Sequence, residues 1–137
     1  ARLVLVASPR HPWARTPPAA AADFAAAQWV CRERGSGTRS ALETALLTLG
    51  LESEILGSAL KLPSNEAICS AVEAGSGVTV LSSLVVRRAL KAGSLIAIDV
   101  NLPTRRFSLL RHKERYLTQA SAAFQKLTAS AADYETL

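Results

Sequence analysis

The sequence predicts an α/β fold with a mostly parallel sheet and flanking helices. Short apolar runs, in which polar and apolar residues do not alternate, are followed along the chain by segments with a helical pattern. Strands of this kind are typical of sheets covered on both faces, and strand–helix succession is typical of parallel sheets. The 137 residues suffice for one domain, or for two small lobes that share a connection, with a buried core.

The first segments follow from apolar runs and helix-start signals. Residues 2–7 are predicted to form a buried strand, which Ser8-Pro9 ends. Thr16 supplies a hydroxyl at an N-cap position and Pro17 suits the first helical position, so a helix is expected over residues 18–27. Residues 29–31 are the next expected strand.

A charged, glycine-bearing turn, RERGSGTR at residues 32–39, then leads into a helix that reaches Leu49 and stops at Gly50. A strand–turn–helix unit brings several backbone N–H groups and the positive end of the helix dipole to one point. Ser36 and Thr38 add hydroxyl donors there. The turn therefore suits a small anion such as a carboxylate, sulfate or phosphate.

The remaining segments are predicted from the same signals. They are a strand over residues 54–62, which Gly57 weakens; a helix from Ser64-Asn65 to Ala74-Gly75; a strand over 77–81; a helix over 84–92 after a cap at Ser82-Ser83; strands over 95–100 and 106–110 around a turn at 101–104; and a closing helix over 117–131.

Three helix starts follow three of these strands, at Ser36–Thr38, Ser64–Asn65 and Ser82–Ser83. Ligands gather at the carboxyl ends of parallel strands, so the three starts are expected to face a common region. Each start alone is more often a simple helix cap. For the three together, a binding cleft and a set of plain helix caps are equally good interpretations.

Catalytic patterns are absent or incomplete. The Gly35–Thr38 turn lacks the lysine and spacing of a Walker loop and is no dinucleotide fingerprint. Ser58 and Lys61 match Ser-x-x-Lys formally, without its companion motifs, and no Gly-x-Ser-x-Gly elbow occurs. Glu33 and Glu66 are best explained as exposed charges at a turn and a helix start. We expect no catalytic residues, no cofactor and no enzyme activity.

Metal binding is not expected either, because His11 and His112 lie far apart and no ligand spacing exists. Cys31 and Cys69 are expected to be buried free thiols. No apolar run approaches the ~18 residues of a membrane helix, and residues 1–7 are too short for a signal peptide's apolar core. The expected location is cytoplasmic, with no membrane partner.

The net charge of +5 raises the question of nucleic-acid binding. Part of the excess lies in one segment that contains Arg105, Arg106, Arg111, Lys113 and Arg115. Only Phe107 and Tyr116 accompany these charges as aromatic residues that stack on bases. A solvated strand face is therefore the preferred interpretation of the cluster.

An ordered set of motifs resembles the effector-binding domain of a LysR-type transcriptional regulator. The motifs are LVLVASPRHPWA at residues 3–14, WVCRERGSGTR at 29–39, SNEAI at 64–68, VEAGSGV at 72–78, LS at 81–82, RFSL at 106–109 and HKERYLT at 112–118. The similarity runs over nearly the whole chain, and the ordered set is more specific than any one piece.

The resemblance implies a type 2 periplasmic-binding-protein fold, in which two α/β lobes joined by crossing strands hold a small effector between them. Residues 1–8 would be a crossing strand from the first lobe, 9–105 the second lobe, and 106–137 the second crossing strand with the returning helix. The residues that would line the effector cleft are Ser36, Gly37, Thr38, Leu62, Pro63, Ser64 and Asn65.

The family's N-terminal helix-turn-helix and most of its first lobe have no counterpart in the sequence, so the first lobe is expected to be incomplete. Binding to DNA is expected only through that absent helix-turn-helix. The apolar side of the closing helix would lack its usual cover. We therefore expect a homo-oligomer, a dimer here and a tetramer at full length, paired through that helix or an edge strand.

The function that the resemblance implies is the sensing of a small, anionic effector such as a carboxylate. A solute-binding protein of a transport system shares the fold and is the alternative, although it would need a secretion signal. An enzyme on a similar two-lobe scaffold is disfavoured because neither a nucleophile nor a base can be identified.

Overall fold

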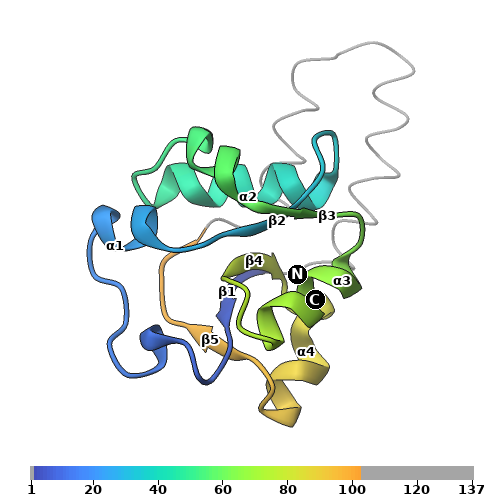
Figure 1. Cartoon of the computed structure of the whole chain (residues 1–137). Coiled ribbons are helices and arrows are strands. Elements are labelled where there is room, and N and C mark those ends of the chain that lie inside the picture. The colour runs from blue at the N-terminus through green and yellow to red at the C-terminus, as the bar shows by residue number, and fades with distance from the viewer. Residues whose placement is uncertain (1, 103–137) are drawn as a thin grey trace.

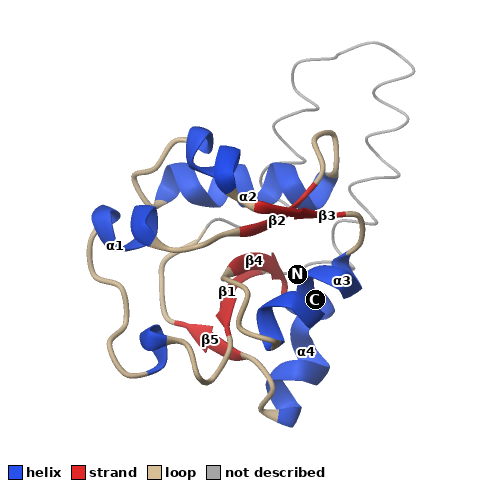
Figure 2. Cartoon of the chain, in the orientation of Figure 1, coloured by secondary structure: helices blue, strands red, loops and turns tan. Residues whose placement is uncertain are grey.

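The computed structural model describes residues 2–102, and Figures 1 and 2 show the arrangement of its elements. The strands are β1 (Leu3–Ala7), β2 (Val30–Arg32), β3 (Leu60–Leu62), β4 (Thr79–Ser82) and β5 (Ile96–Ile98). The helices are α1 (Ala21–Ala26), α2 (Gly37–Thr48), α3 (Asn65–Glu73) and α4 (Ser83–Ala92), with two 3₁₀ helices, η1 (Pro12–Ala14) and η2 (Ser53–Ser58).

The strands run mostly, but not all, in one direction. Strand β1 lies between β4 and β5 and is antiparallel to both, so β4 and β5 share a direction. Strands β2 and β3 are parallel, and a parallel bridge between Trp29 and Val78 joins this pair to β4. The prediction of a mostly parallel sheet is thus met in strand direction, although β1 forms only antiparallel ladders.

The bridge between the two groups of strands depends on a close backbone approach. The Val78 N–H donates to the Gln28 carbonyl, and the Val30 N–H donates to the Val78 carbonyl, each at 2.9 Å. A Cβ atom at Gly77 would lie 2.5 Å from the Gln28 carbonyl oxygen. Glycine at position 77 therefore lets β4 approach the segment that enters β2.

Both faces of the sheet are covered, which explains the continuous apolar runs. The residues of β1 alternate between two clusters of buried side chains: Leu3, Leu5 and Ala7 on one side, Val4 and Val6 on the other. Helix α2 contributes to the first cluster, whereas α3 and α4 contribute to the second. Figure 1 shows α2 on one side of β2 and β3, with α3 and α4 on the other.

Two expected elements are wrong in part. The strand predicted over residues 54–62 is confirmed only as β3, because Ser53–Ser58 is the 3₁₀ helix η2 with Leu56 buried. Lys61 donates from Nζ to the carbonyls of Leu56, Gly57 and Ala59 at 3.0 to 3.4 Å. These bonds satisfy carbonyls at the end of the turn, which a sequence pattern does not reveal.

The first helix starts later than Thr16-Pro17 predicts. Helix α1 is Ala21–Ala26, and its N-cap is Ala20. The Asp23 carboxylate accepts hydrogen bonds from the N–H groups of Ala19 and Ala20, at 2.8 and 3.0 Å. These bonds hold the pKa of Asp23 below its usual value. A carboxylate in the first turn therefore satisfies the local N–H groups and takes the place of the predicted threonine cap.

The other expected elements up to residue 100 are confirmed in kind, with shifts at their ends. The predicted strand over 106–110, the closing helix over 117–131 and the basic cluster at 105–115 lie outside the described residues. Among residues 2–102, no helix combines the length and the apolar character needed to cross a membrane.

Candidate functional site

The start of α2 is built as its sequence predicts. Ser36 is the N-cap, and its Oγ accepts a hydrogen bond from the Arg39 N–H at 3.3 Å. The N–H groups of Gly37 and Thr38 have no partner within the helix and donate to no other group in the described part of the chain. Two donors at the positive end of a helix thus remain available.

The start of α3 repeats this arrangement. Ser64 is the N-cap, and its Oγ accepts from the Ala67 N–H at 3.1 Å. The first amides of this helix, those of Asn65 and Glu66, make no hydrogen bond within residues 2–102. Both helix starts therefore offer backbone donors beside a serine that is already engaged in capping.

The side chains that follow these two caps meet across the edge of the sheet. The Asn65 Oδ1 atom accepts hydrogen bonds from Thr38 Oγ1 at 3.1 Å and from Arg32 Nη1 at 3.0 Å. Strands β2 and β3 are parallel, with Arg32 in register with Leu62, so both strands end at the same edge. The register thereby brings the start of α2 beside the start of α3.

A salt bridge joins Arg32 and Glu33 at this edge of the sheet. Arg32 donates from Nε and Nη2 to the two carboxylate oxygens of Glu33, at 3.0 and 3.2 Å. These hydrogen bonds lower the pKa of Glu33, and the Glu33 carboxylate raises the pKa of Arg32. The Arg32 side chain is 20% exposed, and its three guanidinium nitrogens already donate, two to Glu33 and one to Asn65.

The structure brings together only some of the predicted site residues. Thr38 and Asn65 are in contact, whereas the hydroxyls of Ser36 and Ser64 accept N–H groups of their own helices. Leu62 is half-buried and packs against the apolar cluster beneath α3. The other predicted lining positions, Gly37 and Pro63, are exposed beside them.

Sequence reasoning missed one residue of this arrangement, Arg32. The guanidinium contacts Asn65 only because β2 and β3 align, and that alignment is not visible in either segment alone. The third predicted turn is different. Ser82 caps α4 by accepting from the Leu84 N–H at 3.2 Å, but no hydrogen bond within residues 2–102 joins it to α2 or α3.

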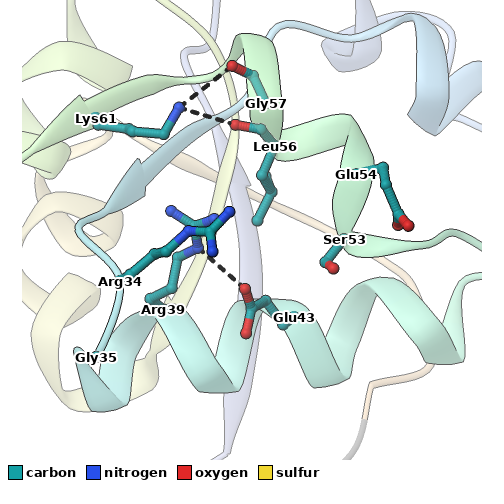
Figure 3. A pocket seen from close by; sticks show the side chains of 9 residues that line it. All are labelled: Arg34, Gly35, Arg39, Glu43, Ser53, Glu54, Leu56, Gly57 and Lys61. Atoms are coloured by element: carbon teal, nitrogen blue, oxygen red, sulfur yellow. Dashed lines mark hydrogen bonds and ion pairs between the residues drawn. The ribbon is translucent and has the colours of Figure 1, made fainter.

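A separate pocket of about 700 Å³ lies on the α2 side of the sheet, between α2, η2 and β3 (Figure 3). Arg39 is 5% exposed and forms part of its wall. Its guanidinium pairs with Glu43 at 3.2 Å and donates to the Arg32 carbonyl at 3.1 Å and the Cys31 sulfur at 3.5 Å. Burial raises the pKa of the Cys31 thiol, and the Arg39 charge offsets this only in part.

Metal and acid–base chemistry find no support in the part of the chain that the structure describes. Residues 2–102 contain no group of three His, Cys, Asp or Glu side chains that could hold a metal ion. Glu33 is paired with Arg32, and the Lys61 ammonium is occupied by backbone carbonyls. Cys31 and Cys69 are both free thiols; Cys31 is buried, as expected, and Cys69 is half-buried.

Comparison with known sequences identifies close relatives. The family model "LysR substrate binding domain" matches residues 1–133. An uncharacterized HTH-type transcriptional regulator, YeiE of Escherichia coli (strain K12), is 39% identical over 124 residues, which cover 89% of this chain and 41% of that protein. The HTH-type transcriptional regulator CbbR of Rhizobium meliloti (strain 1021) is 38% identical over 136 residues, 96% of this chain and 42% of that protein.

Solved structures share the fold. The CcmR regulatory domain of Synechocystis PCC6803 in complex with 2-PG has a TM-score of 0.55 at 23% identity, covering 96% of this chain and 62% of that one. The effector-binding domain of QuiR in complex with shikimate has a TM-score of 0.54 at 17% identity, covering 97% and 62%. The fold class expected from the resemblance is therefore confirmed. The chain belongs to the family of LysR substrate-binding domains.

Proposed function

We propose that this chain is the ligand-sensing part of a LysR-type DNA-binding transcriptional regulator, and that a small anion binds where α2 and α3 begin. The observation that carries the proposal is the double hydrogen bond to Asn65 Oδ1, from Thr38 and from Arg32. It holds two helix starts and a guanidinium at one point. The chain spans about two fifths of the length of the relatives above, so activities of the whole protein are part of the proposal.

The electrostatics of the joined helix starts favour a negative ligand. Four amides, those of Gly37, Thr38, Asn65 and Glu66, lie at positive helix ends, and Arg32 adds a guanidinium whose charge is partly offset by the Glu33 carboxylate. A carboxylate or phosphate accepts hydrogen bonds from such donors at shorter distances and with greater strength than a neutral group does. Two structures of the same fold are complexes with small molecules, 2-PG and shikimate.

The proposed regulator works by a difference in affinity. An effector changes the arrangement of the protein only if it binds one arrangement more tightly than another. We propose that the effector contacts this lobe at Ser36, Gly37, Thr38, Leu62, Pro63, Ser64 and Asn65, and that closure against the first lobe alters a homo-oligomer. DNA is bound through a helix-turn-helix outside this chain, which places the regulator in the cytoplasm.

Other functions have less support. A solute-binding protein of a transport system would use the same fold, but the relatives of this chain are named as transcriptional regulators. An enzyme would need a nucleophile with a base, and the polar side chains at the α2 and α3 starts engage one another or cap helices. We therefore propose a sensor without catalytic activity.

The experiment is isothermal titration calorimetry of the full-length regulator with 2-PG and with shikimate as probes. Thr38→Val removes the hydroxyl at nearly constant volume and is expected to weaken binding of whichever probe the wild type binds by about tenfold, the loss typical of one hydrogen bond to a charged group. Thr48→Val, on the exposed end of the same helix, is the matched control and should leave the affinity unchanged. Equal affinities for wild type and Thr38→Val would remove Thr38 from the site.

A further inference from the structure

The pocket on the α2 side of the sheet is lined by several charged side chains. Arg34, Arg39 and Lys61 line it together with Glu43 and Glu54. Figure 3 shows the guanidinium groups of Arg34 and Arg39 entering the pocket from the α2 start, and Glu54 with Ser53 on the η2 side, beyond Leu56. Opposite charges thus stand at separate parts of one pocket.

Only two of the three cations have free donors. The Lys61 ammonium donates to three backbone carbonyls, which uses all of its N–H groups. Arg39 uses Nε and Nη1 for Glu43, the Arg32 carbonyl and Cys31. Among the described residues, Arg34 and the Nη2 atom of Arg39 donate to no protein group.

The free nitrogen of Arg39 is open to the pocket. No buried side-chain nitrogen or oxygen within residues 2–102 lacks a hydrogen-bond partner. Because Nη2 has no such partner, it must retain contact with solvent, although the Arg39 side chain as a whole is only 6% exposed. A charged group held almost entirely inside the protein, with one donor aimed into a cavity, is already ordered to receive an acceptor.

Of the two carboxylates that line the pocket, one is engaged by an arginine and the other is free in the described part of the chain. Glu43 gives one carboxylate oxygen to Arg39, whereas Glu54 is exposed and makes no hydrogen bond in the described part of the chain. The two glutamates disfavour a ligand with several negative charges, since like charges repel in a confined site. A single carboxylate near the guanidinium groups and a cationic group near Glu54 would complement both parts.

We propose that this pocket binds a small zwitterion, with its carboxylate on Arg34 and Arg39 and its ammonium group on Glu54. The pocket differs from the anion site at Thr38 and Asn65 in its lining residues, and it lies on the α2 side of β2 and β3, opposite α3 (Figure 1). A regulator with such a pocket senses an amino acid or a related amino-carboxylate in addition to the effector of the cleft.

The test uses the whole chain labelled with ¹⁵N and a matched pair of probes, 4-aminobutyrate and butyrate, which differ only in the ammonium group. We expect 4-aminobutyrate to cause saturable shifts of the Arg39 Nε–Hε signal and of the backbone amides of η2, and to bind several-fold more tightly than butyrate. Arg34→Ala should weaken binding by about tenfold, as expected for a charge-assisted hydrogen bond. Glu54→Gln should abolish the preference for 4-aminobutyrate.

Two variants serve as controls for this assignment. Arg87→Ala removes an exposed arginine on α4 without touching the pocket, and Thr38→Val alters the proposed cleft; both should leave the titration unchanged. Shifts that do not saturate, or that persist with equal affinity in Arg34→Ala, would overturn the site. A preference for 4-aminobutyrate that survives Glu54→Gln would overturn the zwitterion as its ligand.

Discussion

The starts of α2 and α3 differ from the start of α4, and the difference separates the proposed ligand site from a plain helix cap. All three helices begin with a serine whose Oγ accepts a backbone N–H, at 3.3 Å for Ser36, 3.1 Å for Ser64 and 3.2 Å for Ser82. At α4, however, the next amide, that of Ser83, donates to the Arg2 carbonyl at 2.8 Å. The α4 start is therefore tied into the sheet.

The three helix starts differ in the residues that follow the capping serine. Thr38 and Asn65 follow the caps of α2 and α3, and they join each other and Arg32 through polar groups. The corresponding part of α4 presents Leu84 and Val85, which are 43% and 38% exposed. The serine caps are thus alike in all three helices, and the proposal of an anion site rests on the polar residues one or two positions after the caps of α2 and α3.

The largest expected effect concerns the packing that holds the α2 start in place. Leu46 is fully buried in the cluster between α2 and the sheet, so Leu46→Ala should lower the free energy of unfolding by about 2–5 kcal/mol. Leu47, its neighbour on the same helix, is 65% exposed, and Leu47→Ala should have little effect. Urea denaturation followed by circular dichroism measures both; similar losses would mean that α2 packs on its other face.

The caps should behave alike in all three helices. Ser36→Ala, Ser64→Ala and Ser82→Ala each remove an acceptor of one backbone N–H, and each should cost about 0.5–2 kcal/mol of stability. Thermal and urea denaturation of the three variants check this. A cost confined to Ser36 and Ser64 would show that the Ser82 hydrogen bond contributes nothing and would sharpen the contrast with α4.

A coupling energy should exist between α2 and α3 and not between α2 and α4. In a double-mutant cycle, Thr38→Val and Asn65→Ala should be non-additive by about 1 kcal/mol, the net worth of one hydrogen bond. Thr38→Val combined with Ser82→Ala should be additive, because no hydrogen bond among residues 2–102 joins the two side chains. Additivity in both cycles would contradict the joined helix starts.

The smallest expected effect is the pH dependence of the Arg32–Glu33 pair. The pKa of Glu33 is below its usual value, so the pair contributes stability above the ordinary pKa of a glutamate and loses it as the pH falls through the lowered value. Wild type and Glu33→Gln should differ slightly at neutral pH, less at high salt, and not at all in acid. Urea midpoints measured across this range provide the check; a difference that grows in acid would assign Glu33 another partner.

Local sequence signals predicted the starts of α2, α3 and α4 well because capping is a local interaction. Ser36 and Ser64 stand next to helical patterns and before the N–H groups that they accept. The contact between Thr38 and Asn65 required the register of β2 against β3, which arises from packing across residues far apart in the chain. The strand–helix pattern placed both segments in one expected region together with Ser82–Ser83, and the likeness to a known family singled out these two.

The error at residues 53–58 and the omission of Arg32 have different causes. Residues 53–58 combine apolar and polar residues in a way that suits a strand, but Lys61 reaches back to the carbonyls of this segment and stabilises a 3₁₀ turn. Arg32 was overlooked because a charged residue at a strand end is usually solvated. Its partner, Asn65, lies 33 positions away in the sequence.

The most direct test of the joined helix starts is an NMR titration of the ¹⁵N-labelled chain with 2-PG, followed amide by amide. We expect saturable shifts, with one common dissociation constant, for the free amides of Gly37, Thr38, Asn65 and Glu66. The amide signals of Ser83 and Leu84 at the α4 start should not shift. Equal shifts at all three helix starts, or shifts at α4 alone, would contradict this expectation.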